Sequence, residues 1–184
     1  MHRDATVLSG CWVTVVHYAA YGSNLHPLRL RARAASARLV GTGYLPDWSL
    51  RFHKRSTDTS GKCSIFKGSS GVYVAVYRMS AADKHLLDGI EGLGSGYVDA
   101  SIVVPGIGEC ATYIAADSHV DDVLQPYDWY REIVLLGCKE LAFPADYTRR
   151  IEQVAAAADT DSDRRQRGWK TVDMLREGLA LRVN

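Results

Sequence analysis

The sequence lacks a hydrophobic run long enough to cross a membrane. A membrane-spanning helix needs roughly 18 to 20 consecutive apolar residues. The apolar run at residues 11–20 is shorter than this and is interrupted by His17. It also lacks the positively charged n-region and the cleavage site of a secretory signal. We therefore expect neither a membrane anchor nor a membrane partner.

Cysteines and histidines are few and do not form metal-binding patterns. The cysteines lie far apart without a C-x-x-C pair, which argues against a zinc site and against a disulfide scaffold. The histidines show no ligand spacing, so we do not expect metal catalysis. Reduced thiols in a cytoplasmic protein are the simplest account. The residues concerned are Cys11, Cys63, Cys110 and Cys138, and His2, His17, His26, His53, His85 and His119.

A large excess of charge of one sign is also absent. The 22 basic and 21 acidic residues give a net charge of +1, which provides no bulk attraction to nucleic acid or to an anionic membrane. Local basic clusters have no aromatic stacking platform beside them, so we interpret them as solvated faces. These clusters are Arg29-Arg31-Arg33, Arg51-His53-Lys54-Arg55 and Arg164-Arg165-Arg167.

The patterns that are present predict one α+β domain over residues 1–184. Alternating or continuous apolar runs, typical of strands, occupy the first two-thirds of the chain, and helical spacing dominates the last third. This order favours an α+β fold over a doubly wound sheet, in which strands and helices alternate. Strands are expected at 11–20, 37–45, 48–52, 63–66, 72–79, 97–104 and 109–116, and helices at 27–35, 80–91, 125–141, 144–158 and 169–181, with a polar break at 159–165.

The segment Tyr21–Leu25, with the sequence Tyr-Gly-Ser-Asn-Leu, joins the first expected strand to the first expected helix. A strand that turns into a helix through such residues directs several backbone N–H groups into one space, which favours an anion. Ser23 or Asn24 can cap the helix. The alternative is an ordinary structural cap, because turns of this kind are common.

Glu91 is the first candidate for chemistry. Ser80 and Asp83 form the pattern of a capping box that opens a helix, and Glu91 ends that helix directly before a glycine-rich segment at 92–96. A carboxylate between Ile90 and glycine can lie in a partly apolar pocket, where it would be a usable base near neutral pH. The alternative is a solvated glutamate at a helix end.

Three motifs in this order resemble the γ-glutamylcyclotransferase family. They are the loop 21–25 after the first strand, the Asp-x-x-Glu-Gly element at 88–92, and the helical pair that begins around Tyr130 and continues through Phe143-Pro144. The resemblance covers about residues 12–155. The order and distances of the motifs look most like the stand-alone, animal-type branch, because the glutathione-specific branch usually has another residue at Asn24.

The resemblance implies a fold and a set of site residues. The fold would be a small mixed or barrel-like β-sheet flanked by helices, with a helical C-terminal third and a helical tail at 159–184. Glu91 would be the catalytic acid and base, Tyr97 would be the tyrosine that follows it in the family, and no metal or cofactor would be needed. Substrate-binding residues would be Tyr18, Ala19, Ala20, Tyr21, Gly22, Ser23, Asn24, Leu25 and Tyr130.

Some parts of the chain depart from the family pattern. The segment 62–65 lacks the glycine-bearing pattern expected there, and the arginine-rich tail from Asp159 onward has no counterpart in the family. The resemblance implies a cytoplasmic enzyme that cyclises a γ-glutamyl compound to 5-oxoproline, with a homodimer as one possible assembly. The alternatives are a cyclotransferase for γ-glutamylamines or a γ-glutamyl-protected biosynthetic intermediate, and a non-catalytic binding module on the same fold.

Overall fold

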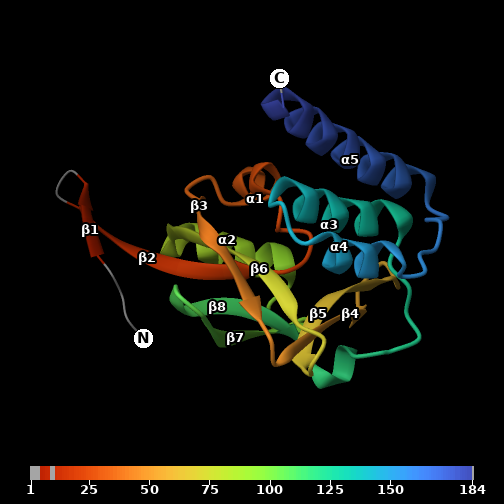
Figure 1. The fold of residues 1–184 in the computed structure, drawn as a ribbon, viewed down its shortest axis with the longest axis horizontal. Coiled ribbons are helices and arrows are strands. Elements are labelled where there is room, and N and C mark those ends of the chain that lie inside the picture. Colours follow the sequence, from red (N-terminus) through yellow and green to blue (C-terminus); the bar gives the residue numbers. More distant parts are fainter. Residues whose placement is uncertain (1–4, 9–10, 184) are drawn as a thin grey trace.

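The computed structural model describes residues 5–8 and 11–183 of the chain. Its strands are β1 (Ala5–Leu8), β2 (Cys11–Ala20), β3 (Arg38–Leu45), β4 (Trp48–Arg55), β5 (Gly61–Lys67), β6 (Val72–Ser80), β7 (Tyr97–Val104) and β8 (Gly108–Ala115). Its helices are α1 (Pro27–Arg33), α2 (Ala81–Glu91), α3 (Asp128–Glu140), α4 (Ala145–Glu152) and α5 (Ser162–Val183), with a short 3₁₀ helix, η1 (Asp117–His119). Figure 1 shows α1, α3, α4 and α5 together above the sheet and the β4–β5 hairpin at its right-hand end. The α+β prediction is confirmed.

The main sheet has the strand order β3-β6-β2-β8-β7, and β1 pairs with the first half of β2. Neighbouring strands in this sheet run antiparallel, except β2 and β8, which run parallel to each other. The second half of β2, Val15–Ala20, pairs with β6. Because β2 lies in the middle of the sheet, its end delivers the loop 21–25 to the centre of the fold.

The sheet curls so that its two edge strands approach each other. Gly43 of β3 lies against Val104 of β7, and a Cβ atom at Gly43 would come 2.2 Å from Val104 Cγ1. No backbone pairing joins these strands in the part of the chain that the structure describes. The predicted barrel-like sheet is therefore present as a strongly curved, open one.

The β4–β5 hairpin is a separate sheet that is bonded to the main one. Ser64 Oγ accepts a hydrogen bond from the Ala115 amide at 2.9 Å, and the Tyr97 hydroxyl donates to the Cys63 carbonyl at 2.7 Å. These bonds hold β5 against β7 and β8. The hairpin thereby forms one wall of the space at the end of β2.

Helix α2 begins and ends as the sequence predicts, but its capping box is incomplete. Ser80 Oγ accepts from the Asp83 amide at 3.1 Å, and Gly92 ends the helix with a left-handed φ of 71°. Asp83 does not reach back to Ser80; it accepts from the amide (2.6 Å) and the hydroxyl (2.5 Å) of Ser36. The Ser80 amide donates to Ser36 Oγ at 3.0 Å instead. A residue distant in sequence therefore completes the cap.

The C-terminal helices differ from their predicted bounds. Helix α4 ends at Glu152, because Ala157 leaves the helix to pair with the segment before α3: its carbonyl accepts from the Asp128 amide and its amide donates to the Pro126 carbonyl. This tertiary pairing overrides the helix propensity of alanine. Helix α5 begins at Ser162, earlier than predicted, where Asp161 Oδ1 accepts from the Arg164 amide at 2.8 Å.

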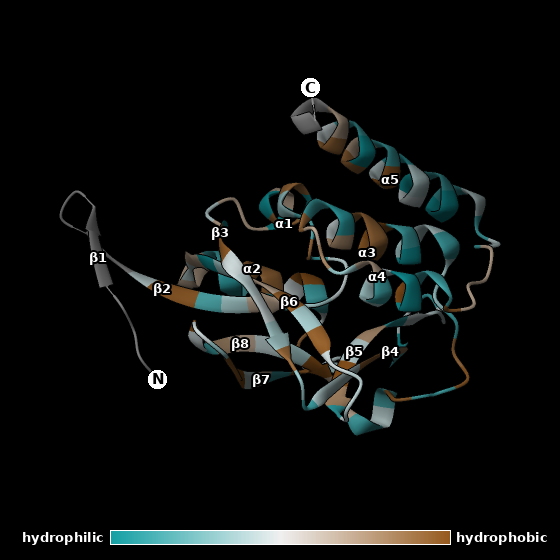
Figure 2. Cartoon of the chain, viewed as in Figure 1, coloured by the Kyte–Doolittle hydropathy of each residue, from teal (hydrophilic) through white to brown (hydrophobic). Residues whose placement is uncertain are grey.

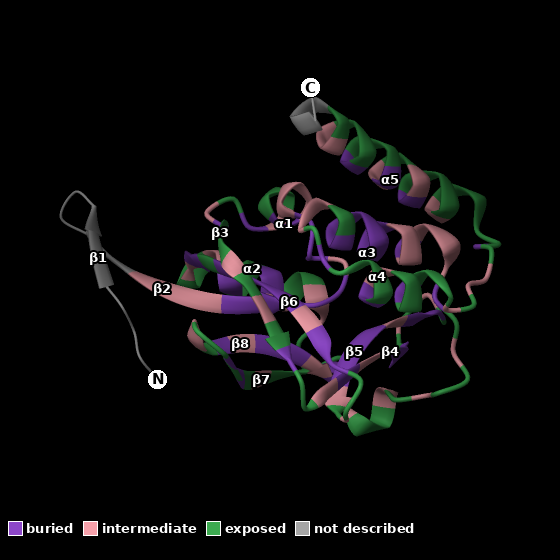
Figure 3. Ribbon diagram, in the orientation of Figure 1, coloured by how far each residue is buried: buried purple, intermediate pink, exposed green. Residues whose placement is uncertain are grey.

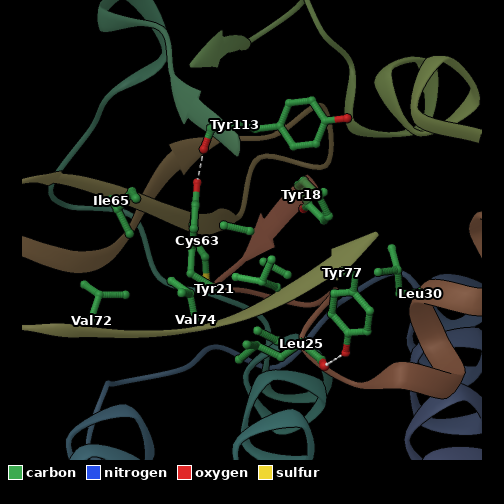
Figure 4. Packing of buried hydrophobic residues seen from close by; sticks show 14 of the residues in the cluster. Tyr18, Tyr21, Leu25, Leu30, Cys63, Ile65, Val72, Val74, Tyr77 and Tyr113 are labelled. Atoms are coloured by element: carbon green, nitrogen blue, oxygen red, sulfur yellow. Dashed lines mark hydrogen bonds between the residues drawn. The ribbon is translucent and has the colours of Figure 1, made fainter. Parts of the chain in front are cut away.

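The core lies between the sheet and the helices, as the purple residues of β6, β8 and α3 show in Figure 3. Figure 2 shows apolar residues on α3, which packs against the sheet, and a largely hydrophilic α5. Buried Tyr77 donates to the Leu25 carbonyl, as Figure 4 shows, and so joins β6 to the loop before α1. Within the described residues, no helix is long and apolar enough to span a membrane.

Candidate active site

A polar pocket of about 300 Å³, including the space at its mouth, lies at the end of β2. Its walls come from β2, the following loop, β5, α2, β7, β8 and α3. Among the described residues, no group of three or more His, Cys, Asp or Glu is placed to hold a metal ion. The lining residues are Tyr18, Tyr21, Gly22, Ser23, Asn24, Cys63, Glu91, Tyr97, Tyr113 and Tyr130.

Glu91 is the carboxylate of this pocket. Its Oε1 atom accepts from Arg33 Nη1 at 2.7 Å and from Asn24 Nδ2 at 3.0 Å. Its Oε2 atom has no hydrogen-bond partner among the described residues. The hydrogen-bond partners of Glu91 are polar, and Ile90, its apolar neighbour in sequence, is 51% exposed, while tyrosine rings and Cys63 also line the pocket. One carboxylate oxygen is held by the protein, and the other is available.

Asn24 connects the loop to Glu91. Its amide nitrogen donates to Glu91 and to the Tyr18 hydroxyl at 3.2 Å, while its Oδ1 accepts from Arg33 Nη1 at 3.0 Å. The prediction that Ser23 or Asn24 caps α1 is wrong. His26 is the N-cap, since its Nδ1 accepts from the amide of the second helical residue. Asn24 is thereby left to orient the carboxylate.

The loop before α1 presents unpaired amides. A turn closes with the bond from the Leu25 amide to the Gly22 carbonyl at 3.0 Å, and no described residue accepts from the amides of residues 22–24. Helix α1 starts later, at Pro27, so these amides belong to the turn and not to the helix terminus. Gly22 lies against Cys63, and a Cβ atom there would come 2.9 Å from Cys63 Cβ.

Five tyrosines surround the pocket, and burial raises the pKa of each hydroxyl well above its ordinary value, so all are protonated at neutral pH. Three of them donate to oxygen atoms of the protein. Tyr21 donates to the Tyr113 carbonyl (Figure 4), Tyr97 to the Cys63 carbonyl, and the Tyr113 hydroxyl to Asp88 Oδ1 at 2.7 Å. These three hydroxyls are committed to holding the walls together.

The other two tyrosines, Tyr18 and Tyr130, accept hydrogen bonds at the pocket. The Tyr18 hydroxyl accepts from Asn24, and the Tyr130 hydroxyl accepts from the Cys63 amide at 3.3 Å. The Tyr130 hydroxyl also donates to the Cys63 thiol, whereas the Tyr18 hydroxyl donates to no described residue. The Tyr18 hydroxyl is therefore available to a ligand in the pocket, and the Tyr130 hydroxyl can donate to one by leaving the thiol.

Not every residue expected to bind substrate reaches the pocket. Ala19, Ala20 and Leu25 lie in the hydrophobic core, and none of them is among the lining residues. The Ala19 carbonyl accepts from Thr112 Oγ1 at 2.9 Å, and the Leu25 carbonyl accepts from Tyr77. Their contribution is to hold the strand and the turn in place.

Arg33 contacts Glu91 and Asn24, and the sequence analysis missed it as a candidate site residue. It was placed in a solvated basic cluster, yet it ends α1 beside Asn24 and Glu91. Burial, together with the charge of Arg33, lowers the pKa of Arg29 to about 10, and only Arg31 of the three is exposed. The interpretation as a solvated face is therefore wrong for two of the three arginines. Cys63 and Tyr113 were also missed, and no local pattern marks them.

Comparisons with known proteins find similar sequences and a similar fold. A model of the AIG2-like family matches residues 71–151, a range that includes Glu91 and Tyr130. The chain is 29% identical over 148 residues to γ-glutamylcyclotransferase of Homo sapiens and 28% identical over 145 residues to that of Bos taurus, covering 74% of this chain and 77% of each relative. A solved structure named γ-glutamyl cyclotransferase superposes with a TM-score of 0.71 at 23% identity, over 89% of this chain and 99% of the other.

Proposed function

We propose that this chain, which resembles γ-glutamylcyclotransferases in sequence and in fold, converts γ-glutamyl amino acids or amides into 5-oxoproline and a free amine. One observation carries this proposal. Glu91 lines a polar pocket with one carboxylate oxygen fixed by Arg33 and Asn24 and the other without a protein partner. A carboxylate in this state can take up and return a proton.

The reaction needs only proton transfer and a folded substrate. The α-amine nitrogen attacks the γ-carbonyl carbon, and the new C–N bond closes a five-membered ring. An α-amine has a pKa of roughly 8, so at neutral pH it must first lose a proton. Glu91 takes this proton and returns it to the departing nitrogen as the original amide C–N bond breaks. It then takes the second proton from the new ring nitrogen and passes it to the amine, which leaves as an ammonium ion. Atoms balance without water, a metal or an organic cofactor.

Substrate positioning falls to the loop and to two tyrosines. The amides of residues 22–24 are unpaired donors at the pocket and suit the α-carboxylate of the substrate. The hydroxyls of Tyr18 and Tyr130 can add donors to that carboxylate or to the developing oxyanion. Holding the tethered amine close to the carbonyl accounts for much of the rate expected of such a site.

The partners implied by this reaction are small molecules. The substrate is a γ-glutamyl compound that enters the pocket, and neither nucleic acid nor a membrane takes part. We propose that the enzyme works in the cytoplasm, where its cysteines stay reduced. The described residues include Cys63, Cys110 and Cys138, all buried as free thiols.

Release of 5-oxoproline from γ-glutamyl dipeptides, γ-glutamylamines and glutathione tests the proposal. We expect Glu91→Gln to lower turnover roughly 100- to 10,000-fold, because amide nitrogen cannot replace the carboxylate in proton transfer. Glu152→Gln is the matched control, since Glu152 also ends a helix but is exposed and far from the pocket residues in sequence. It should leave turnover unchanged.

Two outcomes would contradict the proposal. One is the absence of 5-oxoproline from every substrate with folded wild-type protein, which would favour a binding module on the same fold. The other is full turnover by Glu91→Gln. Circular dichroism of both variants separates a chemical effect from a loss of folding.

A further inference from the structure

Lys54 is a buried lysine beside the pocket that the proposed reaction does not use. It lies on β4, and its side chain is 6% exposed. Its ammonium stands 4.6 Å from the centre of the Tyr97 ring, and Tyr97 lines the pocket. The end of the side chain packs on Gly96, where a Cβ atom would come 2.9 Å from Lys54 Nζ. Lys54 therefore lies against the ring of Tyr97, one side chain away from the pocket lining.

The ammonium of Lys54 differs from those of Lys62 and Lys84, two other lysines with little exposure. Lys62 donates to Asp58 at 2.8 Å, and Lys84 donates to Asp88 at 2.5 Å; each also stands over a tyrosine ring. Lys54 has a ring contact but no acceptor for its three N–H groups among the described residues.

An unpaired ammonium in this position has a physical cost. A charged group taken out of water without hydrogen bonds is expensive to keep. Burial lowers the pKa of Lys54, and the negative charge of Glu91 opposes that effect more strongly than that of Asp58. Lys54 and the reacting carboxylate are thus close enough to influence each other. The Lys54 ammonium is not among the fully enclosed polar atoms of the described residues that lack a partner.

We propose that Lys54 binds a carboxylate carried by the leaving amine of the substrate, and this rests on the proposed function. The amine departs beside Glu91, and a substituent extending along the Tyr97 ring meets the ammonium of Lys54. An amino acid as leaving group supplies the missing acceptor, whereas a neutral amine leaves Lys54 unpaired. Lys54 therefore selects γ-glutamyl amino acids over neutral γ-glutamyl amides.

The test compares two substrates that differ in one charge: γ-glutamyl-alanine and γ-glutamyl-alaninamide. For the wild type we expect kcat/KM to be roughly 10- to 100-fold higher for γ-glutamyl-alanine, the range expected of a hydrogen bond to a charged group. In Lys54→Met this preference should fall to within about twofold of unity, with the loss confined to γ-glutamyl-alanine. Lys54→Arg should retain most of the preference.

Matched controls keep the result specific. Lys170→Met removes an exposed lysine on α5 and should leave the preference unchanged. If Lys54→Met does not fold, the wild type still gives a test. Its preference should shrink between about 0.05 and 0.5 M salt, because an ion pair at a partly open site is screened.

The outcomes separate the two proposals. Equal losses on both substrates in Lys54→Met, or a wild-type preference that is absent or insensitive to salt, would overturn the carboxylate subsite alone. Absence of 5-oxoproline from both substrates with the wild type would overturn the proposed function, and the subsite with it.

Discussion

Two arginines from basic clusters of the sequence each pair with a carboxylate, and the two pairs differ in role. At the pocket, Arg33 contacts Glu91 at 2.7 Å; at the connection between α4 and α5, Arg164 contacts Asp159 at 2.6 Å. Both arginines come from basic clusters that the sequence analysis interpreted as solvated. Neither interpretation holds for these two residues.

The difference lies in how many carboxylate oxygens the protein occupies. Asp159 uses both: Arg164 contacts each oxygen, Trp129 Nε1 donates at 3.1 Å, and the Asp161 amide donates at 3.0 Å. These bonds, those from Arg164 above all, lower the pKa of Asp159 to about 2. Glu91 uses one oxygen and faces a pocket. A fully bonded carboxylate holds structure, and a half-bonded one beside a cavity is available for chemistry.

Among the changes that test this comparison, Arg33→Met should have the largest effect. Without this donor the carboxylate of Glu91 and the amide of Asn24 lose their common partner, so we expect kcat to fall roughly 100-fold with little change in KM. Arg33→Lys should recover part of the rate. Arg31→Met, on the exposed face of the same helix, is the control for steady-state kinetics. Equal losses of kcat in Arg31→Met and Arg33→Met would show that the contact of Arg33 with Glu91 has no special role in turnover.

Asp159→Asn should change stability and spare activity. It removes the charge that holds Arg164 and Trp129 together, and we expect the free energy of unfolding to fall by about 2–3 kcal/mol. Urea unfolding measures this, and 5-oxoproline release per folded molecule should equal that of the wild type. Asp173→Asn, at an exposed position of α5, should have no measurable effect. Loss of activity in folded Asp159→Asn would contradict the structural role.

The difference in the free energy of unfolding between the wild type and Asp159→Asn should also depend on pH. The pKa of Asp159 is about 2 in the folded chain against 3.8 ordinarily, so its charge stabilises the fold above about pH 4, and this contribution disappears as the pH falls toward 2. The stability difference between wild type and Asp159→Asn should therefore be larger at about pH 6 than at about pH 2.5. A difference that stays constant would show that the charge is not its source.

The smallest effect should come from Gly22→Ala. The added methyl would lie 2.9 Å from Cys63 Cβ, so the turn must shift by a few tenths of an ångström and its amides with it. We expect KM to rise roughly 3- to 10-fold, with kcat less affected. Gly89→Ala on α2 is the control, because a Cβ there meets nothing within 4 Å. An unchanged KM would show that the turn does not take part in substrate binding.

The sequence predicted what depends on local pattern. Glu91 and the loop with Asn24 stand in recognisable motifs, and the pattern of apolar residues located the described strands except β1, Ala5–Leu8, which was not predicted. Arg33, Ser36 and Ala157 acquire their roles from partners distant in the chain, and nothing in their neighbours indicates those partners. The same limit explains why α4 was predicted too long and the basic clusters were interpreted as solvent-facing.

The number of residues in the short segment between α1 and β3 is constrained by contacts at both of its ends. Arg33 and Ser36 hold α2 at its last residue, Glu91, and in its first turn, at Asp83, which stand about 12 Å apart along the helix. The spacing of Arg33 and Ser36 along the chain therefore has to match the spacing of their two partners along α2. Residues 34 and 35 between them can be exchanged for others of similar size, but an insertion or deletion there would misplace one end of α2. Among related sequences, the length of this segment should therefore vary less than its amino-acid composition.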